Sequence, residues 1–246
     1  MENSVGSTWF EDWFDTRYYH ILYQNRNHSE ARHFIENLLR YLGLEDGSDV
    51  LDLACGKGRH AKFLSEHGLN VTGIDLSVNS IAEAQKMDSS SLHFEVADMR
   101  EFSLDQKFDV IFNLFTSFGY FEKKEENREV LRQVQSHLKL NGHLVLDFLN
   151  VDHVKSGLPS SEIKNLDGID FHIEKKIEDG IIVKRIQFRD ESGKDHTYHE
   201  RVQALAFADF KEILGDTGMK IINTFGDYNL NPFDPGTSER LILIAQ

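Results

Sequence analysis

Short apolar runs alternate with amphipathic stretches through the middle of the chain. The apolar runs predict buried strands over residues 49–54, 69–76, 92–98, 108–115 and 143–149. Between them, helical spacing of apolar positions predicts helices over 58–67, 79–86 and 125–138. Strands that alternate with helices are typical of a parallel sheet covered on both faces. Because such crossovers are right-handed, the pattern predicts an α/β fold with a doubly wound sheet.

The pattern changes on both sides of this central region. Two amphipathic helices are expected before it, over 8–26 and 29–42. After residue 150, alternating stretches separated by the turn signals EDG and ESG predict an antiparallel meander over 169–178, 181–190 and 195–204. The remaining predicted elements are a helix over 207–217 and strands over 219–228 and 239–245. We therefore expect three parts: a helical cap (1–45), an α/β domain (46–155 and 205–246) and a β insert (160–204).

Composition narrows the classes of partner. The chain has 246 residues, 40% of them hydrophobic, which fits one large domain or one domain with an appended subdomain. Its net charge of −14 disfavours a nucleic-acid partner, because an acidic surface repels phosphate. The single cysteine, Cys55, allows no disulfide within the chain and fits a reducing cytoplasm. We expect no signal peptide and no membrane span, since no apolar run is long enough.

A glycine-rich loop, Gly56-x-Gly58-x-x-Ala61, lies between the first predicted strand and the helix that follows it. In this context glycines let a ligand approach the backbone, and the helix N-terminus offers N–H groups to it. An ordinary tight turn uses the same glycines. Acids at the ends of the next two strands favour a nucleotide site, since Asp75 can accept two ribose hydroxyls and Asp98 can hold an adenine.

Two other functions fit part of this pattern. A dinucleotide cofactor, NAD(P), would make the chain an oxidoreductase, but Asp52 at the end of the first strand would repel a pyrophosphate. A regulatory or scaffold protein could bind a cofactor without turnover. That alternative stays open because no residue stands out as a catalytic base.

Five motifs in order resemble the class I S-adenosylmethionine-dependent methyltransferases. They are VLDLACGKGRH, VTGIDLS, VADMREF, FDVIFNLFTSFGYF and LKLNGHLVLDFLN, within residues 48–150. The resemblance implies a mostly parallel seven-stranded sheet with an antiparallel last strand. The helical N-terminus and the strands of 165–204 resemble a small-molecule subgroup with an antiparallel β insert over the active site. The product of such an enzyme is S-adenosylhomocysteine.

The resemblance also implies roles for particular residues. The methionine portion of the cofactor would lie against the first strand and its loop, at Asp52, Ala54 and Gly56. The ribose would lie at Asp75 and Leu76, and the adenine at Asp98, Met99 and Arg100. The sulfonium would lie above the end of the fourth strand, at Asn113, Leu114 and Phe115.

Cations at the start of the first helix are unfavourable unless an anion lies nearby, because the helix dipole makes that end positive. The cluster here is Lys57, Arg59 and His60. We expect Arg59 or His60 to pair with the cofactor carboxylate, and a solvated turn is the alternative.

Aromatic residues and a cysteine supply further cofactor candidates. Cys55 is more consistent with a small buried residue than with a nucleophile, so its backbone is expected to touch the ligand. Tyr19, Tyr23 and Arg26 share one face of the N-terminal helix, where they either close over the cofactor or pack in the core.

The methyl acceptor is harder to predict. Candidate bases in the FTSFGYF segment are Thr116, Ser117 and Tyr120, for which packing is the alternative role. His196 and His199 fall on opposite faces of a strand, so we expect no metal site, whereas His196 and Tyr198 share a face and could line a substrate pocket. No Asn-Pro-Pro-Tyr follows the fourth strand, which argues against an exocyclic-amine DNA methyltransferase.

The combined expectation is an enzyme that moves a methyl group to an oxygen or nitrogen atom of a small molecule. The insert of 165–204 is expected to serve as a substrate lid, and residues 229–234 to approach the same rim of the sheet. We expect a cytoplasmic monomer or homodimer with no nucleic-acid or membrane partner.

Overall fold

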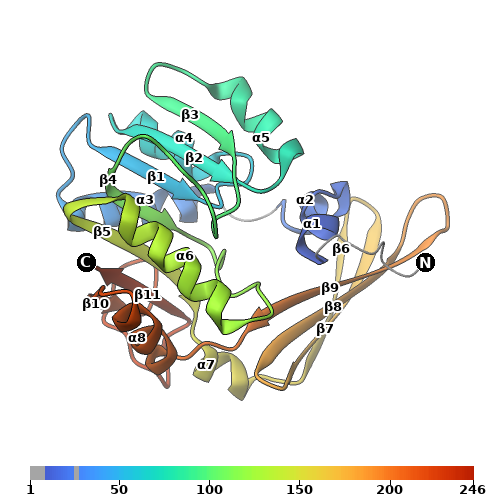
Figure 1. Cartoon of the computed structure of the whole chain (residues 1–246). Helices are drawn as coiled ribbons and strands as arrows, with labels where there is room; N and C mark the ends of the chain where they lie inside the picture. Colours follow the sequence, from blue (N-terminus) through green and yellow to red (C-terminus); the bar gives the residue numbers. More distant parts are fainter. Residues whose placement is uncertain (1–8, 25–27) are drawn as a thin grey trace.

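A twisted seven-stranded sheet forms the centre of the computed structural model, which describes residues 9–24 and 28–246 (Figure 1). The strand order is β10-β11-β5-β4-β1-β2-β3. Its strands are β1 (Asp49–Leu53), β2 (Asn70–Asp75), β3 (Leu92–Val96), β4 (Phe108–Asn113), β5 (Leu138–Leu149), β10 (Ile221–Phe225) and β11 (Arg240–Ala245). All neighbouring pairs are parallel except those made by β11, which runs antiparallel to β5 and β10. The doubly wound sheet with an antiparallel last strand is confirmed.

Helices cover both faces of this sheet because each presents an apolar stripe to it. One face carries α3 (His28–Leu42), α4 (Arg59–Glu66) and α5 (Val78–Ala84), followed by the short η1 (Gln85–Met87). Its core includes Phe34, Leu64 and Ile81. The other face carries α6 (Lys124–His137) and α8 (Phe207–Asp216), with Leu131 and Phe210 in the core.

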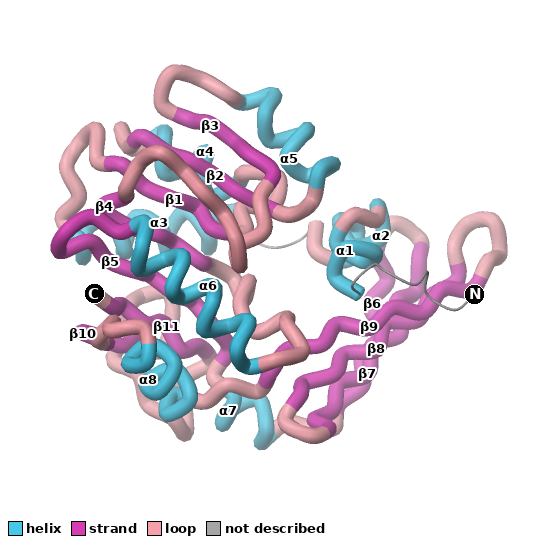
Figure 2. The backbone as a smooth tube through the Cα atoms, in the orientation of Figure 1, coloured by secondary structure: helices cyan, strands magenta, loops and turns pink. Residues whose placement is uncertain are grey.

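A second sheet stands beside the first and has the order β6-β7-β8-β9, with every neighbouring pair antiparallel (Figure 2). It consists of β6 (Ser160–Leu166), β7 (Ile169–Glu178), β8 (Ile181–Arg189) and β9 (Asp195–Gln203), and α7 (Val151–Ser156) leads into it. The helices α1 (Trp9–Phe14) and α2 (Arg17–Leu22) pack on this insert sheet. Trp13 and Leu22 share a core there with Phe171, Ile186 and Phe188.

The expected helix over 8–26 is two helices within the described residues. Thr16 ends the first by donating its hydroxyl to the Trp13 carbonyl, and it caps the second by accepting from the Tyr19 N–H. A threonine is a favourable N-cap, so the chain turns between α1 and α2 instead of continuing one helix.

Other differences have similar local causes. The strand β5 begins at Leu138, earlier than expected, because the LKLNG segment is an irregular strand and not a turn, with Asn141 at φ 64°. The pairing register between β4 and β5 shifts there. Neither α7 nor β6 was predicted. The strand β6 lies at the edge of its sheet and has mainly exposed side chains, so its sequence lacks apolar alternation.

No helix in the described part of the chain is both long and apolar enough to cross a lipid bilayer.

Candidate functional site

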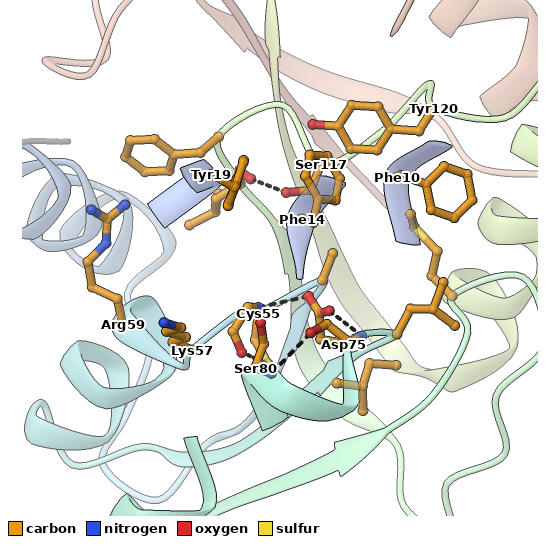
Figure 3. Close-up of a pocket in the computed structure, with 18 of the residues that line it drawn as sticks. Phe10, Phe14, Tyr19, Cys55, Lys57, Arg59, Asp75, Ser80, Ser117 and Tyr120 are labelled. Carbon is orange, nitrogen blue, oxygen red and sulfur yellow. Dashed lines mark hydrogen bonds between the residues drawn. The ribbon is translucent and has the colours of Figure 1, made fainter. Parts of the chain in front are cut away.

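A cavity of about 390 Å³ lies at the carboxyl ends of β1, β2, β3 and β4 (Figure 3). This is the rim of an open α/β sheet where ligands bind, and the volume is in the range of small-molecule sites. Its lining includes many residues predicted to bind a cofactor: Tyr19, Tyr23, Ala54, Cys55, Gly56, Arg59, His60, Asp75, Leu76, Asp98, Met99, Leu114 and Phe115. Asp52, Arg100 and Asn113, also predicted, are not part of the lining.

The loop after β1 owes its shape to backbone conformations that most residues avoid. Ala54, Gly56 and Gly58 all have φ values between 56° and 76°. At Gly58 a Cβ atom would lie 2.4 Å from the Phe94 ring, so only glycine lets the helix pack this closely on β3. At Gly56 a Cβ atom would meet no atom within 4 Å, which leaves room for a ligand against the backbone.

Asp52 lies beneath the loop and not in the cavity. Its side chain accepts a hydrogen bond of 3.1 Å from the Ala61 N–H and so caps the start of α4. The residue is only 1% exposed, and this burial raises the pKa of its carboxyl to about 7. The structure thus places Asp52 as a support of the loop, without direct access to a ligand in the cavity.

We expect the Asp52→Asn variant to gain thermal stability relative to the wild type as pH rises from about 4 to 8. A carboxyl whose folded pKa exceeds its unfolded value stabilises the fold below the unfolded pKa, and that contribution is lost as pH rises through the folded pKa of about 7. Asparagine keeps an oxygen for the Ala61 N–H but cannot ionise. Thermal melting of both proteins at pH 5 and pH 8 measures this, and an equal difference at both pH values would contradict it.

Asp75 forms part of the cavity floor at the end of β2 (Figure 3). One carboxylate oxygen accepts from the Gly56 N–H and the other from the Ser77 N–H, both at 2.8 Å. Burial raises the pKa of this carboxyl, while the two N–H donors oppose the rise. The carboxylate is therefore fixed between the glycine loop and the start of α5, with acceptor capacity left for a ligand.

Asp98 lies at the end of β3 in a charged cluster. Arg100 donates to both of its oxygens, at 2.6 to 3.1 Å, and also to Glu126 at 2.6 Å. Burial alone would raise the pKa of Asp98, but the hydrogen bonds from Arg100 outweigh it and hold the pKa below its usual value. The Arg100 guanidinium also lies 4.7 Å from the centre of the Phe121 ring, which lines the cavity. Arg100, which does not line the cavity, thus orients the lining residues Asp98 and Phe121.

Cationic side chains line one end of the cavity. An Arg59 nitrogen lies 3.0 Å from the His60 ring, and the guanidinium lies 5.2 Å from the centre of the Phe115 ring. The His60 ring stacks on Phe115 at 4.7 Å. Burial, together with nearby Lys57, lowers the pKa of His20, which faces the same space. Lys57 and Arg59 place two cationic side chains at this end of the cavity, beside the start of α4.

We expect Arg59→Ala to weaken binding of S-adenosylmethionine more than binding of its decarboxylated form, with the two losses differing by about tenfold. The reason is that a charge-assisted hydrogen bond to a carboxylate would be lost only for the first ligand. Isothermal titration of both ligands measures this, with Lys57→Ala as a matched removal of a neighbouring cation. Equal losses for both ligands would show that Arg59 does not contact the carboxylate.

The segment after β4 makes an unusual turn beside the cavity. Phe115 and Thr116 have φ values of 58° and 62°, a conformation that costs each residue about 1–3 kcal/mol. Ser117 donates to the Leu114 carbonyl at 2.9 Å, and the Tyr120 hydroxyl donates to the Thr116 carbonyl. Ser117 and Tyr120 line the cavity, but Thr116 does not. Both lining hydroxyls thus donate to backbone oxygens of the turn.

The N-terminal helices supply the wall opposite the glycine loop. Sequence reasoning identified Tyr19 and Tyr23 but missed Phe10, Phe14 and His20, which also line the cavity. The i,i+4 spacing of Phe10 and Phe14 was a usable signal, because it puts both rings on one helix face. Asp15 joins this wall to the α/β domain by accepting from the Ser77 hydroxyl at 2.7 Å and from the Asn79 side chain.

The insert does not line the cavity itself; it carries the helices that do. The Tyr198 ring packs 4.5 Å from that of Trp13, and His196 stacks on Phe188 with its Nε2 atom 2.8 Å from Asp190. Neither His196 nor Tyr198 is part of the lining, so the structure does not bring these two catalytic candidates to the site. The lining also takes nothing from residues 229–234. Arg26 lies outside the described residues.

Neither a reactive thiol nor a metal cluster is found at the site within the described residues. Cys55 lines the cavity, and burial raises the pKa of its thiol well above the usual value, which keeps the sulfur protonated and a poor nucleophile. Within residues 9–24 and 28–246, no group of three metal-ligating side chains comes together.

Comparisons with known proteins agree with this geometry. A family model described as a methyltransferase domain matches residues 50–142, which hold the glycine loop, Asp75 and Asp98. The glycine/sarcosine N-methyltransferase of Aphanothece halophytica is 27% identical over 234 residues, covering 92% of this chain and 84% of its own. An amino-sugar N,N-dimethyltransferase of Streptomyces venezuelae, which acts on dTDP-3-amino-3,4,6-trideoxy-α-D-glucopyranose, is 31% identical over 42% of this chain and 43% of its own.

The fold agrees with solved structures as well. An S-adenosylmethionine-dependent methyltransferase from Clostridium acetobutylicum matches with a TM-score of 0.78 at 22% identity, covering 93% of this chain and 95% of the other. The matching residues 50–142 supply the glycine loop, Asp75 and Asp98 of the cavity. The expected S-adenosylmethionine cofactor and methyltransferase activity are confirmed, in place of a nicotinamide-dependent reaction. The chain carries a methyltransferase domain over residues 50–142 and has the fold of the class I S-adenosylmethionine-dependent methyltransferases.

Proposed function

We propose that this enzyme methylates the nitrogen atom of a small amine. The observation that carries the proposal is the cavity itself, which is enclosed by the glycine loop on one side and by the aromatic helices α1 and α2 on the other. Support also comes from relatives, because the two curated proteins described above are both named as N-methyltransferases.

The residues present fit S-adenosylmethionine. Asp75 offers carboxylate oxygens to the ribose hydroxyls, and Leu76, Met99 and Phe10 offer apolar surface to the adenine. Arg59 offers a cation to the carboxylate of the methionine portion, and the open space at Gly56 admits its backbone. When bound, the cofactor supplies a methyl group on a sulfonium, which needs no further activation. The chain's own residues then have to align the acceptor and exclude water.

The charge of the lining favours one class of amine. With Arg59 assigned to the cofactor carboxylate and the lining acids Asp75 and Asp98 to its ribose and adenine, Lys57 is a second cation of the lining. The second cation suits an acceptor that carries a carboxylate of its own, such as a small amino acid. This favours the chemistry named for the Aphanothece relative over that named for the amino-sugar relative.

Transfer of a labelled methyl group tests the proposal directly. The enzyme is incubated with methyl-labelled S-adenosylmethionine and with glycine, sarcosine or a dTDP-amino sugar, and mass spectrometry locates the methyl group. We expect N-methylated product, with faster transfer to the amino acids. Transfer only to hydroxyl compounds, or no transfer to any amine while S-adenosylhomocysteine binds, would contradict N-methylation.

We further propose a cytoplasmic monomer or homodimer that has no nucleic-acid or membrane partner. The net charge of −14 supports the exclusion of nucleic acid, and the single cysteine supports a reducing compartment. The division into a cap (1–45), an α/β domain (46–155 and 205–246) and an insert (160–204) is also a proposal. The shared core of α1, α2 and the insert suggests that the cap helices and the insert act together.

A further inference from the structure

A buried ion pair lies directly behind the turn that follows β4. Asp147, on β5, is 0% exposed; one of its carboxylate oxygens accepts a hydrogen bond of 2.8 Å from Arg240 Nε, on β11, and lies 2.7 Å from Arg240 Nη2 in the ion pair. The Tyr228 hydroxyl lies 3.3 Å from its other oxygen. Neither member of the pair lines the cavity. A buried pair of this kind is costly to form, so its contacts indicate what it supports.

Three further hydrogen bonds of this pair reach the turn. The carboxylate of Asp147 accepts from the Phe115 N–H at 2.8 Å, and its backbone oxygen accepts from the Thr116 N–H at 3.0 Å. Arg240 donates to the Thr116 hydroxyl at 2.9 Å. Both N–H groups and the one hydroxyl of the two left-handed residues are therefore satisfied by Asp147 and Arg240. The pair holds in place a conformation that these residues would otherwise avoid.

The left-handed turn at Phe115 and Thr116 shapes one wall of the cavity. The Phe115 ring packs against His60 and Arg59, and Ser117 and Tyr120 follow it into the lining. Relaxation of Phe115 and Thr116 toward ordinary φ values would redirect all of these side chains. We propose that Asp147 and Arg240 are positioning residues that hold this turn in the geometry required for methyl transfer.

Two conservative variants test the proposal without leaving a buried charge unpaired. Thr116→Val removes the hydroxyl that Arg240 reaches while keeping the β-branched shape, so its strain at positive φ is similar. Arg240→Lys keeps a cation beside Asp147 but loses the planar fork that reaches the carboxylate and Thr116 together. Lys139→Met serves as the control, because Lys139 bridges Asp49 and Asp109 at the opposite end of the strands.

The first readout needs no acceptor. In amide hydrogen exchange followed by mass spectrometry, we expect peptides covering 113–121 to exchange at least tenfold faster in both test variants and unchanged in the control. Unchanged exchange in both test variants would overturn the proposal. This measurement does not depend on the proposed N-methylation. If the wild-type enzyme methylated no amine, the proposed function would be refuted, but hydrogen exchange would still test the positioning role.

The second readout is kinetic and rests on the proposed function. With an amine acceptor at saturating cofactor, we expect kcat to fall at least tenfold in each test variant, while the Kd for S-adenosylhomocysteine changes by less than threefold. The kcat of the double variant should be no lower than that of the slower single variant, because both substitutions release the same turn. A multiplicative loss, or a rise in Kd equal to the fall in kcat, would overturn the positioning role.

Discussion

Asp75→Ala should weaken the binding of S-adenosylhomocysteine by about 1.5–3 kcal/mol, the cost of losing hydrogen bonds to a charged acceptor. The carboxylate already lies in the cavity floor, fixed by the N–H groups of Gly56 and Ser77. A ribose hydroxyl therefore meets an acceptor that requires no reorganisation on binding. Isothermal titration measures the loss, which corresponds to roughly ten- to a hundredfold in Kd.

Two further variants separate recognition from loop structure. Asp75→Asn keeps an oxygen for one of the two backbone N–H groups but removes the negative charge. Asp105→Ala removes an exposed carboxylate of the same domain that does not line the cavity, and it should bind like the wild type. Unchanged affinity in Asp75→Ala, with melting behaviour near that of the wild type, would exclude Asp75 from the cofactor site.

Trp13→Ala should abolish measurable methyl transfer and leave affinity for S-adenosylhomocysteine within about tenfold, or 1.4 kcal/mol. Trp13 is 0% exposed, packs on Tyr198 and donates from its indole nitrogen to Glu200 at 2.8 Å. Truncation of a buried tryptophan costs about 3–5 kcal/mol, which is enough to release helices as short as α1 and α2 from the insert. The wall formed by Phe14 and Tyr19 would then be lost, while the glycine loop and Asp75 remain.

Trp13→Phe isolates the contribution of the indole N–H, since it keeps most of the packing. Phe207→Ala, a half-exposed aromatic on α8 outside the lining, controls for a general loss of aromatic packing. Hydrogen exchange should rise in 9–24 and 169–202 of Trp13→Ala and stay unchanged in β1 and β2. Full turnover in a Trp13→Ala protein with these helices released would show that the wall is not needed for transfer.

The sequence was most informative about the central sheet. Apolar runs and helical spacing predict its strands because the inner strands are buried on both faces, and the order of elements then limits the topology. It was least informative where burial is partial. The edge strand β6 has little apolar alternation, and the break between α1 and α2 depends on one capping side chain, Thr16.

For the site, the sequence predicted the residues at strand ends, but it did not predict which elements cover a strand face. Asp75 and Asp98 follow strands whose ends meet at one rim, so their place near a ligand follows from topology. Alternation correctly puts His196 and Tyr198 on the same side of β9, but it cannot say what covers that side. Here Trp13 and the neighbouring helix residues cover it, so these side chains pack in the insert core and do not reach the cavity. The role of Asp147 depends on partners about 30 and 90 residues away in the sequence, which no local pattern reveals.

The packing of α1 and α2 on the insert also bears on the order in which the chain becomes folded during synthesis. Trp13 and Glu200 are 187 residues apart, and each helix has only six residues, too few for a stable helix alone in water. The segment of α1 and α2 must therefore stay without this partner until β9 has been translated. The α/β core up to β5 can assemble in that interval, so the enzyme closes its own active site with a segment that was made before that core.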